Sequence, residues 1–330
     1  MKKLFISMLA VATLASCSQE DIIVADKGEL IGFNSFVENS TRAADPSLTT
    51  ATFTDFKLWG TVGASDNTPV AIFADDTVSG TIGANSVWSC TTKTQYWING
   101  AVYNFAGVKN GTVATLENGL PKTITFAYTA DGKTDLVYAR SKQYTGKATQ
   151  NDLVALEFKH LLSKVKFTLE NTTSNATNAG VYTYTLTDVK ITNAIVDGTY
   201  TVADTKNDDN TYNVVGTWAN NQANGTAVTF ENITGVTNGT SMDSANEKLI
   251  IPMTNATVTY NVNIYYGGKI ITTIPGSYKV TEFKPGYAYN LKLSTGLNNE
   301  IKFSVEEEPE WNYDVNGDNA VDGKDNITLQ

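Results

Sequence analysis

Cysteine and histidine are almost missing from this chain. Its 330 residues include two cysteines, Cys17 and Cys90, and one histidine, His160. This excludes histidine-rich metal sites, and a Ser-His-Asp or Cys-His mechanism would depend on His160 alone. A packed structural histidine is the simpler interpretation. If Cys17 is modified, Cys90 has no partner for a disulfide within the chain and behaves as a small apolar residue.

Long apolar runs and excess positive charge are also scarce. Beyond residue 16 no apolar stretch approaches the roughly 20 residues that a membrane-spanning helix needs. The net charge at pH 7 is −10, and an acidic chain repels the phosphates of nucleic acids. No phosphate-binding glycine loop or zinc-ligand spacing is present. We therefore expect no nucleic-acid partner.

The one sustained apolar run lies at the N-terminus. Lys2 and Lys3 precede apolar and small residues 4–15, and Leu-Ala-Ser then leads to Cys17. This layout predicts an export signal, residues 1–16, that is removed from the mature protein. The ending resembles the lipobox of bacterial lipoproteins, which implies lipidation of Cys17 and anchoring by acyl chains. The acidic residues Glu20 and Asp21 that follow resemble the surface-export signal of some Gram-negative lipoproteins, which implies a surface-exposed lipoprotein of the cell outer membrane. An ordinary secretory signal that happens to contain a cysteine is the alternative.

From residue 51 onward apolar side chains recur at every second position. In residues 258–264 valine, tyrosine and isoleucine alternate with threonine and asparagine, and Gly267-Gly268 then precedes a second apolar run. This pattern predicts a half-buried strand, a tight turn and a returning strand. No long stretch follows the helical period, and threonine, valine and tyrosine are frequent. We therefore predict an all-β fold of antiparallel sheets packed face to face, with little helix.

Two domains are expected, because the chain is longer than one hydrophobic core usually organises. The polar stretch 142–152 indicates a boundary between them. A short apolar stretch from Ile31 to Phe36 predicts a separate strand, followed by a polar linker. The expected parts are a signal peptide (1–16), a lipidated tether with the N-terminal strand (17–45), an N-terminal β-sandwich (46–151), a C-terminal β-sandwich (152–305) and an acidic tail (306–330).

Several segments occur in the order found in a known family. They are Tyr96-Trp97 with Tyr103-Asn104-Phe105-Ala106, Asp135 to Ala139, Leu156 to Phe167, Leu249 to Pro252, Pro285 to Leu291, and Ile301 to Val305 leading to Trp311. Together they resemble the fimbrillins, fimbrial subunit lipoproteins of Gram-negative anaerobes. The resemblance implies two tandem transthyretin-like antiparallel β-sandwich domains. It also implies a structural subunit of fimbriae (pili) that serves adhesion and is not an enzyme, with other fimbrial subunits, the outer membrane and a host or bacterial surface receptor as partners.

The resemblance further implies assembly by strand exchange. An arginine-specific protease removes the N-terminal strand, and the C-terminal segment of a neighbour fills the groove through backbone hydrogen bonds and alternate side chains. The implied processing site lies between Arg42 and Ala43, although one arginine in a polar linker is commonplace. The implied strand-exchange residues are Ile31, Phe33 and Phe36 in the removable strand and Phe303, Val305 and Trp311 in or near the donor region.

The acidic tail has the spacing of a calcium-binding loop. Its candidate ligands, at positions 1, 3, 5, 7, 9 and 12 of the loop, are Asp314, Asn316, Asp318, the Ala320 carbonyl, Asp322 and Asp325. Asn319 stands where glycine usually makes the turn, so an acidic exposed tail without calcium is the alternative. A compact calcium loop cannot also be an extended donor strand, so the two hypotheses for this tail exclude each other. No other cofactor is expected.

Two other functions stay open. A monomeric glycan-binding surface lipoprotein would stack sugars on exposed aromatic side chains. Four of the five tryptophans, Trp59, Trp88, Trp97 and Trp218, are more simply interpreted as core or inter-sheet residues. Trp97 and Tyr103 discriminate between these functions, because burial between sheets favours the structural role and exposure in a row favours sugar binding. A hydrolase would need a carboxylate pair, and the 34 acidic residues show no arrangement that nominates one.

Overall fold

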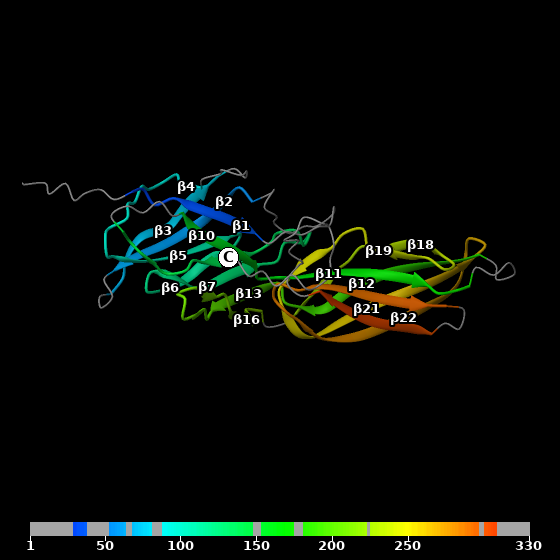
Figure 1. Cartoon of the computed structure of the whole chain (residues 1–330). Coiled ribbons are helices and arrows are strands. Elements are labelled where there is room, and N and C mark those ends of the chain that lie inside the picture. Colours follow the sequence, from blue (N-terminus) through cyan, green and yellow to red (C-terminus); the bar gives the residue numbers. More distant parts are fainter. Residues whose placement is uncertain are drawn as a thin grey trace, which may run out of the picture.

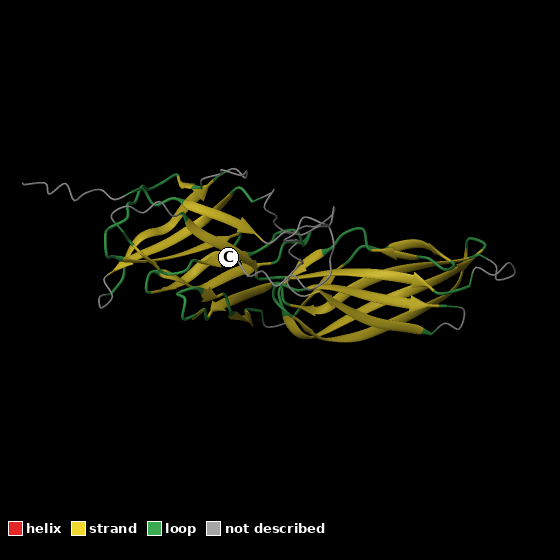
Figure 2. Ribbon diagram, in the orientation of Figure 1, coloured by secondary structure: helices red, strands yellow, loops and turns green. Residues whose placement is uncertain are grey.

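The computed structural model of the chain describes most of the residues between Glu29 and Glu308 (Figure 1). The described ranges are 29–37, 53–63, 68–80, 88–147, 153–174, 181–222, 225–296 and 300–308. Within these ranges the regular elements are all strands, drawn as yellow arrows in Figure 2. No helix there is long and apolar enough to cross a membrane. The predicted all-β fold is confirmed.

The N-terminal half contains a large sheet and a smaller one. The eight-stranded sheet has the order β1 (Phe33–Val37), β10 (Val154–His160), β8 (Val137–Arg140), β5 (Val102–Lys109), β2 (Asp55–Gly63), β3 (Val70–Ser79) and β4 (Ser89–Cys90), and β9 (Tyr144–Thr145) also pairs with β5. The four-stranded sheet has the order β16 (Gly216–Asn220), β13 (Asp197–Val202), β7 (Leu120–Ala127) and β6 (Thr112–Glu117), and a separate ribbon joins β14 (Thr205–Lys206) to β15 (Tyr212–Asn213). In the large sheet β1 runs parallel to β10, and the other neighbours are antiparallel.

The eight-stranded sheet is buried on both faces. Phe105 and Ala106 are neighbours on β5 and both are fully buried, because their side chains point to opposite faces. Phe105 belongs to an aromatic core with Phe33 and Trp88, whereas Ala106 belongs to a second core shared with the four-stranded sheet. This explains why the central strands read as continuous apolar runs instead of a strict alternation.

The C-terminal half consists of two five-stranded sheets packed over one core. One sheet has the order β19 (Ser241–Asp243), β11 (Ser163–Asn171), β23 (Ala288–Thr295) and β24 (Ile301–Glu308), with β20 (Lys248–Ile250) also paired to β11. The other has the order β17 (Thr226–Thr229), β12 (Tyr182–Ala194), β21 (Met253–Tyr266) and β22 (Lys269–Phe283), with β18 (Ile233–Thr237) also paired to β12. The predicted hairpin is present as β21 and β22, and both turn glycines have positive φ, 56° at Gly267 and 76° at Gly268.

Several strands that follow the expected domain boundary at residues 151 and 152 belong to sheets of the N-terminal half. β10 lies in the large sheet of the N-terminal half, between β1 and β8. β13 and β16 also belong to the N-terminal half, where β13 pairs with β7 and buries Tyr200 in the core next to Ile124. Figure 1 accordingly places their labels with β6 and β7. The polar stretch 142–152 lies between strands of one sheet, so it does not separate the two halves.

Candidate functional site

The N-terminal segment 29–37 joins the two edges of the eight-stranded sheet. Its second part, β1, pairs in parallel with residues 154–158 of β10 at one edge. Its first part binds residues 88–97, which begin next to β4 at the other edge. Four backbone hydrogen bonds make this second contact: Ile31 N to Gln95 O at 3.0 Å, Phe33 N to Trp88 O at 3.2 Å, Trp88 N to Phe33 O at 3.0 Å and Trp97 N to Glu29 O at 3.0 Å. The segment therefore closes the sheet around its aromatic core.

Two side chains of this segment complete that core. Ile31 is 4% exposed and Phe33 is fully buried, whereas Leu30, which directly precedes Ile31, is 56% exposed. The ring of Phe33 meets those of Phe73 and Phe105 edge to face, with centroids 5.8 and 5.7 Å apart. Burial of one such side chain stabilises a fold by about 1.5–3 kcal/mol. The segment thus combines backbone hydrogen bonds with inward-facing apolar anchors.

The walls of this site were missed in the sequence. One wall is β10, whose Val154, Leu156 and Phe158 alternate with exposed or half-buried residues and so predict a strand. The other wall is the segment 88–97, where Trp88 and Trp97 are each 1% exposed. The alternation in β10 is visible in the sequence, but its parallel pairing with β1 joins residues more than a hundred positions apart, and no local pattern reports it.

β1 also contains Phe36, the third residue predicted for the removable strand. Its backbone pairs with Glu157 of β10. The structure does not describe its side chain. The strand predicted from Ile31 to Phe36 is present, shifted by a few residues to Phe33–Val37.

Phe303 and Val305, predicted for the donor region, lie in β24 at the edge of a C-terminal sheet. β24 pairs with β23 in antiparallel register from Ile301 to Glu308. The Phe303 ring is half-buried and stacks on Tyr278 of the opposite sheet, with centroids 4.0 Å apart and planes 15° apart. Both residues therefore pack within their own sandwich, and Trp311 lies beyond the described residues.

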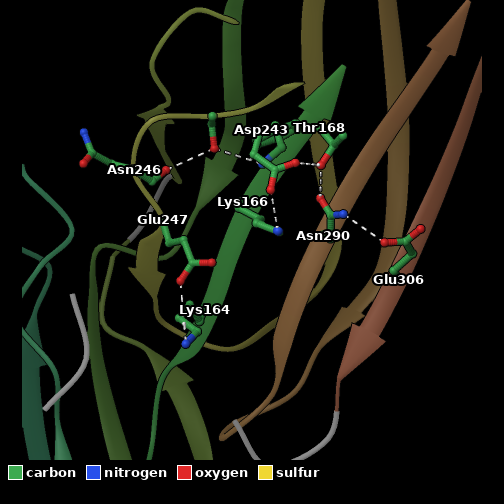
Figure 3. A network of polar contacts seen from close by, with 10 residues as sticks. Lys164, Lys166, Thr168, Asp243, Asn246, Glu247, Asn290 and Glu306 are labelled. Atoms are coloured by element: carbon green, nitrogen blue, oxygen red, sulfur yellow. Dashed lines mark hydrogen bonds and ion pairs between the residues drawn. The ribbon is translucent and has the colours of Figure 1, made fainter. Parts of the chain in front are cut away.

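A polar network crosses the face of this sheet that is turned away from the core (Figure 3). Lys166 Nζ lies 2.8 Å from Asp243 Oδ2, and Asn290 donates to Glu306 at 2.9 Å. Thr168 Oγ1 lies between them, 2.6 Å from Asp243 Oδ1 and 2.8 Å from Asn290 Oδ1. Its single proton serves one of these acceptors at a time. The network connects β24 through β23 to β11, although exposed ion pairs contribute little individually.

His160 forms a buried pair with a residue that the sequence analysis did not single out. His160 Nδ1 lies 2.7 Å from Asp135 Oδ2, and the two side chains are 1% and 0% exposed. The pair joins the end of β10 to the start of β8. Asp135 stands in the segment Asp135 to Ala139 that carries part of the family resemblance, so that motif was the available signal. The position fits a structural histidine.

Cys90 and four of the five tryptophans lie within the described part of the fold. Cys90 is half-buried in β4, with Sγ 3.3 Å from Thr92 Oγ1, and is a free cysteine. Three tryptophans are core residues: Trp59 at 5% exposure and Trp88 and Trp97 at 1% each. Trp218 packs against Tyr200 and donates from Nε1 to the Leu161 carbonyl at 2.9 Å.

The remaining predicted site residues lie outside the described ranges and stay predictions. They are the lipidation site Cys17, the processing site Arg42 and Ala43, the donor residue Trp311, and the calcium ligands Asp314, Asn316, Asp318, Ala320, Asp322 and Asp325. Among the residues that the structure does describe, no group of three or more His, Cys, Asp or Glu side chains is arranged to hold a metal ion.

Comparison with known proteins points in one direction. The profile of a family described as fimbrillin-like matches residues 41–309. A fimbrial protein from Bacteroides vulgatus is similar in structure, with a TM-score of 0.58 at 15% identity, over 86% of this chain and 99% of the other. A fimbrial assembly protein from Parabacteroides distasonis gives a TM-score of 0.45 at 12% identity, over 84% of this chain and 96% of the other. No curated protein matches significantly. The similarity to the Bacteroides vulgatus protein shows a shared fold.

Proposed function

This chain belongs to the fimbrillin-like family, and we propose that it is a structural subunit of surface fimbriae that assembles by strand exchange and serves adhesion. The observation that carries the proposal is the position of segment 29–37. This short extended peptide pairs with β10 at one edge of the eight-stranded sheet and with residues 88–97 at the other edge. It also contributes the side chains of Ile31 and Phe33 to the core. Arg42 follows the end of β1 by five residues, so one cut there would separate this peptide from the rest of the chain.

Loss of segment 29–37 would leave a groove suited to a replacement strand. Its walls would present the backbone groups of β10 and of residues 88–97, and its floor would present the rings of Phe73 and Phe105. An extended segment satisfies such walls with ladder hydrogen bonds and fills such a floor with alternate side chains. The drive toward assembly is therefore the burial of this apolar surface, and no catalytic residue is needed.

The donor in this proposal is the chain that follows β24. Phe303 stacks on Tyr278 and holds β24 in its own sandwich, so the residues from Trp311 onward are the ones left to reach a neighbour. Phe303 and Val305 then act as the anchor of the donor segment. The alternative use of this tail as a calcium loop would withdraw residues 314–325 from the groove.

The lipid anchor fits the same sequence of events. Acylated Cys17 would hold the unprocessed subunit at the outer membrane, with segment 29–37 in its own groove. Cleavage after Arg42 would release the subunit from its lipid and empty the groove in one step. Membrane release and assembly competence would then be coupled.

The placement of Trp97 and Tyr103 favours this structural function over a sugar-stacking platform. Each residue is 1% exposed, and the two rings meet edge to face at 4.7 Å within the aromatic core. Rings in that position are not available to stack on a sugar. A monomeric glycan-binding protein that uses these aromatic residues is therefore disfavoured.

The experiment compares two purified chains, one starting at Ser18 and one at Ala43. We expect the chain from Ala43 to form ladders of denaturant-resistant oligomers, and the chain from Ser18 to stay monomeric until an arginine-specific protease is added. The variant Arg42→Lys keeps the charge and should resist that protease, which makes it the matched control. Oligomerisation that is indifferent to residues 18–42 would refute strand exchange.

A further inference from the structure

A polar cavity of about 280 Å³ lies between the two sheets of the N-terminal half. It shares no lining residue with segment 29–37. Its lining includes Asn104 of β5, Lys122 of β7, Tyr138 and Arg140 of β8, Asp204 after β13 and Tyr212 of β15. Polar side chains from five separate strands or their ends thus meet in one hollow, which the proposed assembly mechanism leaves unused.

Arg140 is the central cation of this cavity. Val137 and Ala139 face the aromatic core, so Tyr138 and Arg140 face the four-stranded sheet. The guanidinium lies 4.5 Å from the centroid of the Tyr212 ring, and Nη2 donates to Asn104 Oδ1 at 3.3 Å. Nη1 is buried and has no hydrogen-bond partner among the described residues. Because Nη1 has almost no accessible surface, a ligand in the cavity would meet the other N–H groups of the guanidinium, which are strong donors to a carboxylate.

The neighbouring charges are already engaged with protein groups. Lys122 Nζ lies 3.0 Å from Glu117 Oε2. Asp204 accepts hydrogen bonds from Tyr138 Oη at 2.7 Å and from Val215 N at 3.2 Å. Burial raises the pKa of the Asp204 carboxyl, and its hydrogen bonds and the charge of Arg140 oppose that rise. Arg140 is therefore the cation best placed to meet an anionic ligand.

The rest of the lining suits hydroxyl groups. Asn104, Asn118 and Gln143 line the cavity. The side-chain oxygens of Asn104 and Gln143 already accept hydrogen bonds from Arg140 and Lys206, so these two residues offer their amide N–H groups as donors. The Asp204 carboxylate adds an acceptor. A cavity of this size is at the small end of ligand pockets and holds about one ring with its substituents.

We propose that this cavity binds an acidic sugar, whose carboxylate pairs with Arg140 and whose hydroxyl groups contact the amides and Asp204. An acidic peptide side chain would use the guanidinium but has no hydroxyl groups for the remaining partners. Acidic sugars would then be the class of ligand through which the proposed subunit adheres to a surface. It uses residues separate from the strand-exchange groove, so either proposal can fail without the other.

Calorimetric titration of the chain from Ser18 with D-glucuronate and with D-glucose tests the site. We expect glucuronate to bind at least about tenfold more tightly, because a charge-assisted hydrogen bond to Arg140 is lost with glucose. Arg140→Met should abolish the difference between the two sugars, and Arg140→Lys should recover part of it. Lys279→Met, at an exposed position in β22 outside the cavity, is the matched control.

A second variant covers the case in which Arg140→Met does not fold, as judged by thermal unfolding. Gln143→Ala should weaken binding of both sugars by a similar factor and leave their ratio unchanged. Equal affinity for glucuronate and glucose, or binding of neither, would overturn the proposal. Equal affinity for glucuronate and an acetylated Glu-Glu amide peptide would also overturn it, in favour of a peptide site.

Discussion

At the scale of single residues, Phe33 fastens the N-terminal segment to the molecule. It is fully buried among Phe73 and Phe105, and Leu30 on the same segment is 56% exposed. We expect Phe33→Ala to lower the free energy of unfolding of the unprocessed N-terminal half by about 3–5 kcal/mol, because a large cavity remains. Leu30→Ala should change it by less than about 0.5 kcal/mol. Urea unfolding followed by tryptophan fluorescence measures both, and similar effects of the two variants would contradict the proposed anchoring.

Tyr128 gives a prediction about alkaline stability. Burial, reinforced by the charge of Asp131, raises the pKa of Tyr128 to about 12, and its buried hydroxyl has no hydrogen-bond partner among the described residues. The unfolded chain loses this proton near pH 10, before the folded chain does, so stability falls as pH rises from about 10 toward 12.

Tyr128→Phe should remove part of that alkaline loss and leave the stability at pH 7 equal or slightly higher. Thermal midpoints measured between pH 7 and 11.5 test this, with Tyr266→Phe, whose residue is 50% exposed, as the matched control. If the thermal midpoint of Tyr128→Phe falls with pH as steeply as those of Tyr266→Phe and the unmodified chain, Tyr128 does not contribute to the alkaline loss of stability.

At the scale of elements, the N-terminal segment can be locked in its groove. Leu30 and Tyr96 form an antiparallel bridge, flanked by hydrogen bonds from Ile31 N to Gln95 O and from Trp97 N to Glu29 O. The Cα atoms of such a non-hydrogen-bonded pair lie about 4.5 Å apart, within the range that a disulfide spans. Leu30→Cys with Tyr96→Cys, in a Cys90→Ser chain from Ser18, should therefore form a disulfide.

After cleavage at Arg42 the oxidised double variant should stay monomeric, and a reductant should start ladder formation. Each single cysteine variant should assemble in both conditions, which controls for the substitutions themselves. Assembly of the oxidised double variant at the normal rate would mean that the segment need not leave its groove.

The elements also show what the sequence could predict. Alternation in residues 258–264 indicated β21, and Gly267-Gly268 indicated its turn, because strand period and turn chemistry are local. The sheet membership of β10, β13 and β16 was not predictable in this way, because it depends on pairing across long sequence separations. For the same reason the apolar stretch from Ile31 to Phe36 was predicted as a strand, whereas its pairing with β10 was not predicted.

At the scale of the whole molecule, the candidate acceptor and donor lie in different halves. The segment 29–37 belongs to the N-terminal half and β24 to the C-terminal half, and Figure 1 shows the two halves end to end. The last residue of β24, Glu308, pairs with Ala288, which in turn pairs with Lys164 at the start of β11, so β24 ends near the junction of the halves. Donation from one subunit to the next, as proposed above, would place different surfaces of the two subunits in contact. Such a contact is heterologous and propagates into a filament unless the rotation closes a ring.

Identification of the segment that fills the emptied groove tests this account most directly. The acceptor is a chain from Ala43 with Tyr96→Cys and Cys90→Ser, and the donor is a chain from Ser18 with Asn312→Cys and Cys90→Ser. The account predicts a disulfide between the two introduced cysteines in mixed oligomers, and far less of it when Lys269→Cys in β22 replaces Tyr96→Cys. Equal cross-linking at both positions, or oligomers without a bond at the groove, would contradict it.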